Sequence, residues 1–160
     1  YMRVIRDKTA VLFEAAAHCG AMIANAPAAT CTALKTAGLH IGLAFQLVDD
    51  ALDYDGNAAD LGKNVGDDLA EGKPTLPLIH AMQHCSGDDA DILRQAVLSG
   101  GTERLDDVIR VIRQSGALDY TRQLAHQQAD LAREHLSVLP ASDYRTALMQ
   151  MCDLAVARVS

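Results

Sequence analysis

Three aspartates stand at positions i, i+1 and i+4 where an apolar helical stretch comes to its end: Asp49, Asp50 and Asp53. At this spacing Asp49 and Asp53 share one face of a helix, and Asp50 lies one step around it. Two unit charges ~6 Å apart repel by roughly 3 kcal/mol at an effective dielectric constant of about 20. The negative end of the helix dipole adds to this repulsion. We therefore expect the three carboxylates to hold a cation.

The segment that follows the acids indicates which cation the carboxylates bind and which ligand shares that cation. Hard divalent ions such as Mg²⁺ prefer carboxylate oxygens and usually share their coordination with substrate phosphates. Residues 62–77 are rich in glycine and carry Lys63 and Lys73. Lysines are point-charge partners for phosphate, and glycines allow the backbone to approach a ligand closely. The pattern predicts a Mg²⁺–diphosphate site, although it is not a Walker A loop, because G-x-x-x-x-G-K-[ST] is absent.

Two other interpretations of the acids fit less well. A solvated acidic helix end is disfavoured because residues 39–48 are apolar on most faces of the expected helix. A calcium-binding EF-hand loop would begin at Asp53 and continue through Asp55. In that loop Gly56 would fall at position 4 instead of position 6, and position 12 would be Asn64 instead of glutamate.

Composition narrows the class of protein. The chain has 160 residues and is 49% hydrophobic, which suits one domain, or most of one, with a sizeable core. Its formal net charge of −7 argues against nucleic-acid binding, and with no Trp, two Phe and four Tyr it has few side chains for base stacking. The cysteines form no C-x-x-C pair and are expected to be reduced thiols of a cytosolic protein: Cys19, Cys31, Cys85 and Cys152.

The N-terminal region does not have the pattern of a signal peptide. Residues 1–8 are charged and lack an apolar central region. Residues 15–34 carry no Asp, Glu, Lys or Arg, but Gly20 and Pro27 interrupt them, so we expect two buried helix segments and not a membrane span. Because the chain begins at Tyr1 and opens directly into a helical pattern, we expect a piece of a longer protein.

Helical periodicity and helix-breaking residues predict an all-α fold. Breaks are expected at Asn25-Ala26-Pro27, at Gly100-Gly101, at Gly116 and at Pro140, with Ser142 as a helix cap. Residues 56–73 are expected to form a loop. Residues 88–160 carry no pattern that indicates chemistry and should serve packing or subunit contacts. The helices are expected at residues 2–24, 28–54, 75–84, 88–99, 103–115, 117–138 and 143–158.

Several short motifs occur together in a characteristic order. They are Lys8-Thr9-Ala10, then Phe45-Gln46-Leu47-Val48-Asp49-Asp50-Ala51-Leu52-Asp53, then Gly62-Lys63-x-x-Gly66-x-Asp68, and then Gly72-Lys73-x-Thr75-Leu76-Pro77. In this order and spacing the chain resembles the trans-prenyl diphosphate synthases, with particular likeness to bacterial octaprenyl diphosphate synthases. The combination is far more specific than any one motif, and the likeness extends over nearly the whole chain.

The resemblance implies a fold and a set of site residues. Residues 1–160 would be the C-terminal part of a single isoprenoid-synthase-type helical bundle whose N-terminal half is missing, in a cytoplasmic homodimer. By resemblance, Asp49, Asp50 and Asp53 would bind Mg²⁺. The residues implied to contact the substrate diphosphate are Lys8, Thr9, Gln46, Lys63 and, less directly, Lys73. Those implied to be catalytic are Lys8, Asp49 and Asp50.

The resemblance also implies a reaction. The allylic C–O bond of a substrate such as farnesyl diphosphate breaks, isopentenyl diphosphate attacks the carbocation, and a proton is lost. Repetition would give a long-chain product, octaprenyl diphosphate, for quinone side chains. Fixed positive charge aimed at the leaving diphosphate stabilises the transition state more than the ground state. An upstream aspartate-rich motif of the family is absent here, so we expect residues 1–160 alone to show no turnover.

Two alternatives stay open at this point. The chain could belong to a non-catalytic partner subunit of a heteromeric prenyl diphosphate synthase, in which an upstream D-D-x-x-D motif would be degenerate. It could also be a helical protein with an incidental acid cluster. Magnesium-dependent binding of a bisphosphonate, and its loss in Asp49→Ala, would separate a diphosphate-binding protein from the second alternative.

Overall fold

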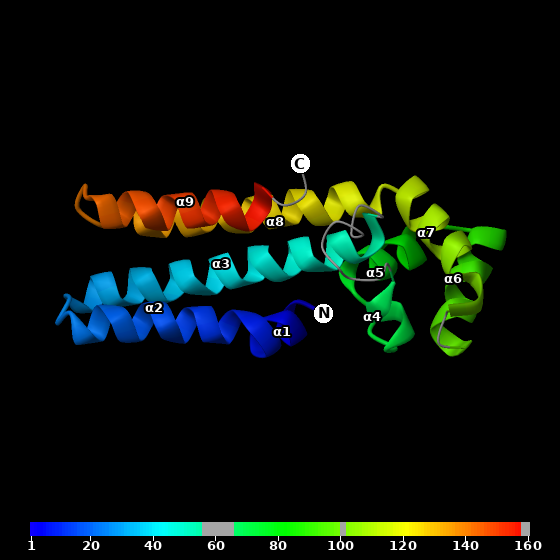
Figure 1. Ribbon diagram of the computed structural model, residues 1–160, viewed down its shortest axis with the longest axis horizontal. Coiled ribbons are helices and arrows are strands. Elements are labelled where there is room, and N and C mark those ends of the chain that lie inside the picture. Colours follow the sequence, from blue (N-terminus) through cyan, green and yellow to red (C-terminus); the bar gives the residue numbers. More distant parts are fainter. Residues whose placement is uncertain (56–65, 100–101, 158–160) are drawn as a thin grey trace. The chain divides into compact units, whose positions relative to one another are not determined.

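The computed structural model describes residues 1–55, 66–99 and 102–157, and every regular element within these ranges is helical. The all-α fold predicted from the sequence is therefore confirmed. The elements, shown in Figure 1, are α1 (Met2–Ile5), the π-helical turn η1 (Arg6–Ala10), α2 (Val11–Ile23), α3 (Ala28–Asp55), α4 (Asp67–Ala70), α5 (Leu76–His84), α6 (Asp88–Ser99), the 3₁₀ turn η3 (Thr102–Arg104), α7 (Leu105–Gln114), α8 (Ala117–Leu136) and α9 (Asp143–Ala157).

The chain divides into two compact units. The first contains residues 1–48 and 124–160, and the second contains residues 49–123. Both α3 and α8 run through the boundary, so each helix contributes one part to each unit. The long helix α3 thus has its first 21 residues, 28–48, in the first unit and its acid-bearing end, 49–55, in the second.

In the first unit α2 and α3 form a tightly packed helical hairpin (Figure 1). The connection turns at Asn25, whose φ of 53° is left-handed, and Pro27 directly precedes α3. Close approach depends on two glycines of α3. A Cβ at Gly38 would lie 2.5 Å from the Phe13 carbonyl oxygen, and one at Gly42 would lie 2.6 Å from the Cα of Ala10. Only glycine lets the two backbones come this near.

The C-terminal helices complete the first unit. His40 of α3 shares a hydrogen bond of 2.8 Å with Gln128 of α8, and Arg133 of α8 bonds to Asp153 of α9. Small side chains on α8 are fully buried, namely Ala125, Ala129 and Ala132. Because alanine takes little space, helices can pack closely around this segment of α8.

The second unit has its own apolar core. Tyr54 at the end of α3 packs among buried residues of α4, α5, α6, α7 and the start of α8. These include Leu69, Leu78, Leu93, Val108, Val111, Ile112 and Leu118. The core holds the acid-bearing end of α3 against the short helices that follow it in sequence.

Most of the predicted helix limits agree with the structure. Ser142 caps α9 by accepting a hydrogen bond of 3.2 Å from the backbone N–H of Arg145, and Gly116 has a left-handed φ of 75° between α7 and α8. Two features were not predicted. The expected loop at 56–73 contains α4, and its residues 56–65 lie outside the described part of the chain. The expected helix at 2–24 contains the π-helical turn η1.

Among the described residues one helix, α3, is long and apolar enough to cross a membrane, judged by length and composition alone. In its most apolar 18-residue window, 56% of the residues are buried inside the structure. The core helix of a folded domain has the same composition, so this is weak evidence for a membrane span.

Candidate functional site

The three predicted metal ligands lie on the last turns of α3, where the helix dipole is negative. Asp50 is only 1% exposed, whereas Asp49 and Asp53 are half-buried. The residues before them, Ala44, Leu47 and Val48, are fully buried. Their apolar packing fixes this part of the helix and carries the carboxylates into an environment that penalises charge.

Asp53 ties the end of α3 to α4. Its carboxylate oxygen Oδ2 accepts a hydrogen bond of 3.3 Å from the backbone N–H of Asp68, and its carbonyl oxygen accepts one of 2.9 Å from Gly66. Gly66 has a left-handed φ of 83°, and a Cβ there would lie 2.4 Å from the Leu105 side chain. The G-x-D part of the sequence motif therefore builds a tight turn that brings two further acids, Asp67 and Asp68, to Asp53.

The electrostatics of this cluster favour a bound cation. Burial, the negative charge of Asp68 and, to a smaller extent, that of Asp67 raise the pKa of Asp53 from 3.8 to about 6. Backbone N–H groups of Asp68 and Asp67 lower it only in part. A positive ion beside these carboxylates would offset both the desolvation and the mutual repulsion.

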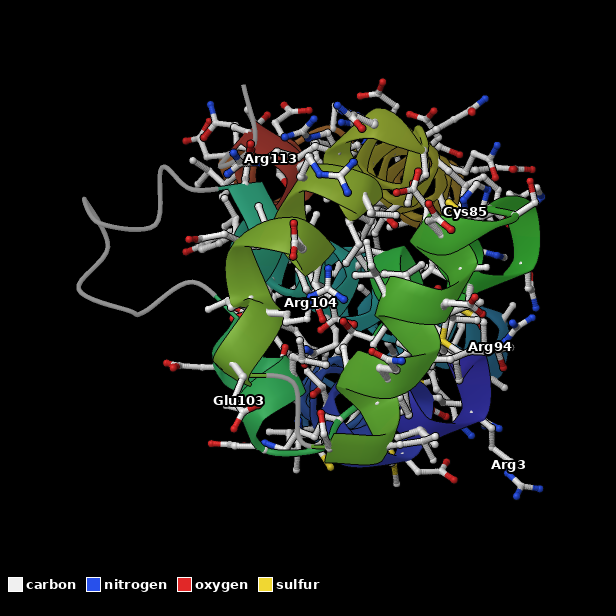
Figure 2. All side chains as sticks on the ribbon, turned by 90° about the vertical axis from the view of Figure 1, so that its right-hand side faces the viewer. Arg3, Cys85, Arg94, Glu103, Arg104 and Arg113 are labelled. Atoms are coloured by element: carbon white, nitrogen blue, oxygen red, sulfur yellow. The ribbon has the colours of Figure 1, made fainter. Side chains whose placement is uncertain are left out.

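Two arginines also bond to residues at this end of α3, and neither was predicted from the sequence. Arg113 at the end of α7, labelled in Figure 2, donates from Nε to the carbonyl oxygen of Tyr54 at 3.2 Å. Arg122 of α8 forms an ion pair with Asp55. Arg113 thus satisfies a backbone carbonyl at the helix C-terminus, and the positive charges of both arginines oppose the negative end of the helix dipole. The partners are 59 and 67 residues apart in sequence, so no local pattern could reveal them.

In the first unit, two residues predicted to contact diphosphate lie together. The Thr9 hydroxyl in η1 donates a hydrogen bond of 2.7 Å to the side-chain oxygen of Gln46 in α3. Lys8, the preceding residue of the π-helical turn, is exposed. Single π-turns inside helices occur often at functional sites, because they break the regular hydrogen-bond ladder and displace side chains.

Of the two lysines predicted to contact diphosphate from the loop, only Lys73 lies in the described part of the chain. Lys73 follows α4, is exposed, and forms an ion pair with Glu71. That hydrogen bond, together with the charges of Glu71, Asp68 and Asp53, raises the pKa of Lys73. Its ammonium group therefore stays charged and feels the field of the acid cluster. Lys63 lies outside the described residues.

The donor set suits a hard cation that is completed by a substrate. Within residues 1–55, 66–99 and 102–157, no three His, Cys, Asp or Glu side chains are gathered closely enough to hold a metal ion by themselves. Magnesium is commonly bound through one or two carboxylates, waters and substrate phosphates, not through an all-protein cage. One or two of the carboxylates of Asp49, Asp50 and Asp53 would be enough for that mode of binding.

The EF-hand interpretation is wrong for a structural reason. α3 continues as a regular helix through Asp55, so Asp53 and Asp55 do not stand in a loop. The first ligands of an EF-hand come from the start of a 12-residue loop. Asn64, the residue expected at the last loop position, lies outside the described residues.

Known proteins match this chain in sequence and in fold. The profile of the family described as Polyprenyl synthetase matches residues 1–114. The octaprenyl diphosphate synthase of Haemophilus influenzae is 47% identical over 159 residues, which cover 99% of this chain and 48% of that protein. An all-trans-nonaprenyl-diphosphate synthase of Rhodobacter capsulatus is 45% identical over 159 residues, covering 99% of this chain and 49% of that protein.

A solved structure agrees with these matches. A polyprenyl synthase from Caulobacter crescentus, complexed with calcium and isoprenyl diphosphate, superposes with a TM-score of 0.91 at 44% identity, covering all of this chain and 49% of the other. The chain thus spans about half the length of the relatives it matches, and in the octaprenyl enzymes the matched part is the C-terminal half. The chain belongs to the polyprenyl synthetase family.

Proposed function

We propose that this chain supplies one half of a trans-polyprenyl diphosphate synthase, which extends an allylic diphosphate with isopentenyl diphosphate. The observation that carries the proposal is the crowding of carboxylates at the end of α3. Asp50 is buried there, and burial together with Asp68 raises the pKa of Asp53 to about 6. A cation beside acids held in this way would offset their burial and mutual repulsion, and a Mg²⁺–diphosphate substrate would provide one.

The proposed metal is Mg²⁺, held by Asp49, Asp50 and Asp53. When bound, such an ion neutralises charge on the leaving diphosphate. The carboxylate-only donor set and the calcium in the Caulobacter crescentus relative both favour a hard divalent ion over zinc or copper. The ion pair of Arg122 with Asp55 and the bond from Arg113 to Tyr54 would keep the end of α3 in place as the charge of the cluster changes.

The proposed diphosphate contacts are Lys8, Thr9, Gln46, Lys63 and Lys73. The bond from Thr9 to Gln46 supports this assignment for two of them, because it fixes both polar side chains in one orientation. Lys8 would act as a catalytic cation beside the scissile bond, and its exposed position leaves it able to reach a ligand. The assignment of all five to one diphosphate rests on the resemblance of the motifs.

The proposed reaction breaks the allylic C–O bond, and the diphosphate leaves with the bonding electron pair. The double bond of isopentenyl diphosphate then attacks the allylic carbocation to form a C–C bond. Loss of a proton from the adduct gives the lengthened allylic diphosphate. Side chains that are positively charged before the reaction stabilise the developing negative charge without reorganisation.

The proposed product is octaprenyl diphosphate for quinone side chains, made by a cytoplasmic homodimer. A long prenyl product is supported by relatives that are named as octaprenyl and nonaprenyl diphosphate synthases. The cytoplasm is supported by the four free thiols of Cys19, Cys31, Cys85 and Cys152, which suit a reducing compartment.

The test is turnover of a fusion protein. The N-terminal part of the Haemophilus influenzae octaprenyl enzyme that this chain does not match is joined to residues 1–160. We expect Mg²⁺-dependent conversion of isopentenyl and farnesyl diphosphate, abolished by EDTA and reduced by at least about a hundredfold in Asp49→Ala. Residues 1–160 alone should show no turnover. Unchanged activity in Asp49→Ala, or turnover by the unfused chain, would contradict the proposal.

A further inference from the structure

The last turn of α3 is held at three successive residues, and Tyr54 is the middle one. The carboxylate of Asp53 accepts a bond from the backbone of α4, and Asp55 forms an ion pair with Arg122 of α8. The carbonyl oxygen of Tyr54 accepts the bond from Arg113 of α7. The ring of Tyr54 is fully buried in the core of the second unit. A phenylalanine would fill the same space, so packing alone does not account for the hydroxyl.

The hydroxyl of Tyr54 lies near the hydroxyl of Thr75, the residue directly before α5. Burial raises the pKa of Tyr54, and the nearby Thr75 hydroxyl lowers it in part. Both oxygen atoms are buried, and within the described residues neither makes a hydrogen bond of good geometry. A buried hydroxyl without a partner is costly, and its hydrogen rotates to suit a neighbouring acceptor. The two hydroxyls can therefore satisfy each other.

Thr75 occupies the N-cap position of α5 but does not cap the helix. A threonine at this position usually accepts a hydrogen bond from one of the first N–H groups of the helix. The backbone of Thr75 is extended, with φ of −88° and ψ of 170°, and its hydroxyl caps no N–H of α5, a helix that lies wholly in the described part of the chain. Pro77 has no N–H and so removes one possible donor. The hydroxyl of Thr75 is therefore available to Tyr54.

The segment before Thr75 lies against the acid cluster. Gly72, just after α4, has a left-handed φ of 71°, and the N–H of Lys73 donates to the carbonyl oxygen of Asp68 at 2.8 Å. The negative charges of Asp68 and Asp53 act on the Lys73 ammonium group. The position of this cation relative to the acids therefore depends on where the segment meets the end of α3.

We propose that Tyr54 and Thr75 are positioning residues, whose paired hydroxyls fix the segment that carries Lys73 against the acid-bearing end of α3. Tyr54 directly follows Asp53, and Thr75 stands two residues after Lys73. Both hydroxyls are buried, so the pair acts through Asp53 and Lys73 and not by contact with a substrate. This inference rests on the proposed function, because it assigns a role within the proposed Mg²⁺–diphosphate site.

The first test measures whether the two hydroxyls support each other in residues 1–160. Tyr54→Phe and Thr75→Val each remove one hydroxyl with little change of shape, so each should raise the equilibrium constant for unfolding by about fivefold. The double variant should raise it no further, because no unpaired hydroxyl then stays buried. Urea denaturation in EDTA provides the constants. Independent effects, which would multiply to about 25-fold in the double variant, would refute the pairing.

The second test measures whether the pair positions Lys73, and it uses the fusion protein described above. A bisphosphonate is titrated in the presence of Mg²⁺. Lys73→Ala should raise the Kd by about fourfold in the unmodified fusion. The same change should raise it by less than about twofold when Thr75→Val or Tyr54→Phe is also present. Thr75→Ser keeps the hydroxyl and should preserve the full effect. An equal effect of Lys73→Ala in every background would overturn the proposal.

A matched control separates positioning from a general loss of stability. Thr121→Val removes another buried threonine hydroxyl of the second unit, which donates to the carbonyl oxygen of Ala117 at 2.8 Å. This variant should leave the effect of Lys73→Ala unchanged. If Thr121→Val reduces that effect as much as Thr75→Val does, the role of the Tyr54–Thr75 pair is structural only, and the proposal is wrong.

The failure of this inference differs from the failure of the proposed function. Absence of Mg²⁺-dependent binding in the unmodified fusion would contradict the proposed function, and with it this role for the pair. Mg²⁺-dependent binding without coupling between Lys73 and Thr75 would contradict the positioning role alone.

Discussion

At the scale of single residues, the raised pKa of Asp53 makes the stability of the fold depend on pH. Its pKa is raised from 3.8 to about 6, so the folded state binds this proton more tightly than the unfolded state does. The ionised carboxylate therefore destabilises the fold. This penalty is absent below about pH 4 and grows as the pH rises, until it is complete above the folded pKa of about 6.

We predict that Asp53→Asn stabilises the metal-free chain. The rise in the pKa of Asp53 from 3.8 to about 6 corresponds to about 3 kcal/mol, which solvent screening of a half-exposed group reduces to about 1 kcal/mol at pH 7.5. The asparagine oxygen can still accept the bond from the Asp68 N–H. Urea denaturation in EDTA checks the gain, which should disappear at pH 4. A loss of stability at pH 7.5 would contradict this account of the cluster.

A second residue-scale prediction concerns the bond between Thr9 and Gln46. Thr9→Val removes the hydroxyl that donates to Gln46 at 2.7 Å. The free energy of unfolding should fall by about 1 kcal/mol, because a partly buried amide loses a partner. A double-mutant cycle with Gln46→Leu should give a coupling energy of about 0.5–1.5 kcal/mol. Additive effects would mean that the two side chains do not support each other.

At the scale of elements, close packing of α2 on α3 can be tested with two glycines. A Cβ at Gly42 would lie 2.6 Å from the Cα of Ala10, the last residue of η1 directly before α2, whereas a Cβ at Gly20 would meet nothing within 4 Å. Gly42→Ala should destabilise the chain by about 2 kcal/mol or more, because backbone must move. Gly20→Ala should stabilise it by about 0.5–1 kcal/mol through helix propensity. Thermal melts that rank the two variants the other way would refute this packing.

The sequence predicted where helices begin and end better than it predicted the contacts between distant side chains. The helix breaks at Asn25 and Gly116 and the helix cap at Ser142 depend on local backbone chemistry, and the structure confirms them. The π-helical turn η1 was missed because the periodicity of apolar residues does not distinguish a π-helical turn from an α-helical one. The short helix α4 was missed because the residues around it read as a glycine-rich loop.

The same distinction holds for the candidate site. The spacing of Asp49, Asp50 and Asp53 was visible in the sequence, and so was the Gly66-x-Asp68 turn. The partners that fix them were not visible: Arg113 and Arg122 come from helices that the sequence analysis assigned to packing. Long-range pairing depends on how the helices fold together, and one sequence carries no direct signal for it.

At the scale of the whole molecule, residues 1–160 match only about half the length of each relative. The acid cluster at the end of α3 is therefore proposed to be one part of a site that the whole family fold completes.

The most direct test of the central claim is calorimetric titration of a bisphosphonate into the fusion protein, with and without Mg²⁺. Asp106→Ala is a matched control, since it removes an exposed acid of α7 outside the cluster. The account predicts Mg²⁺-dependent binding that Asp106→Ala retains and Asp49→Ala weakens by at least about tenfold, or 1.4 kcal/mol. Binding that needs no Mg²⁺, or that Asp49→Ala leaves unchanged, would contradict the claim that these acids form a Mg²⁺–diphosphate site.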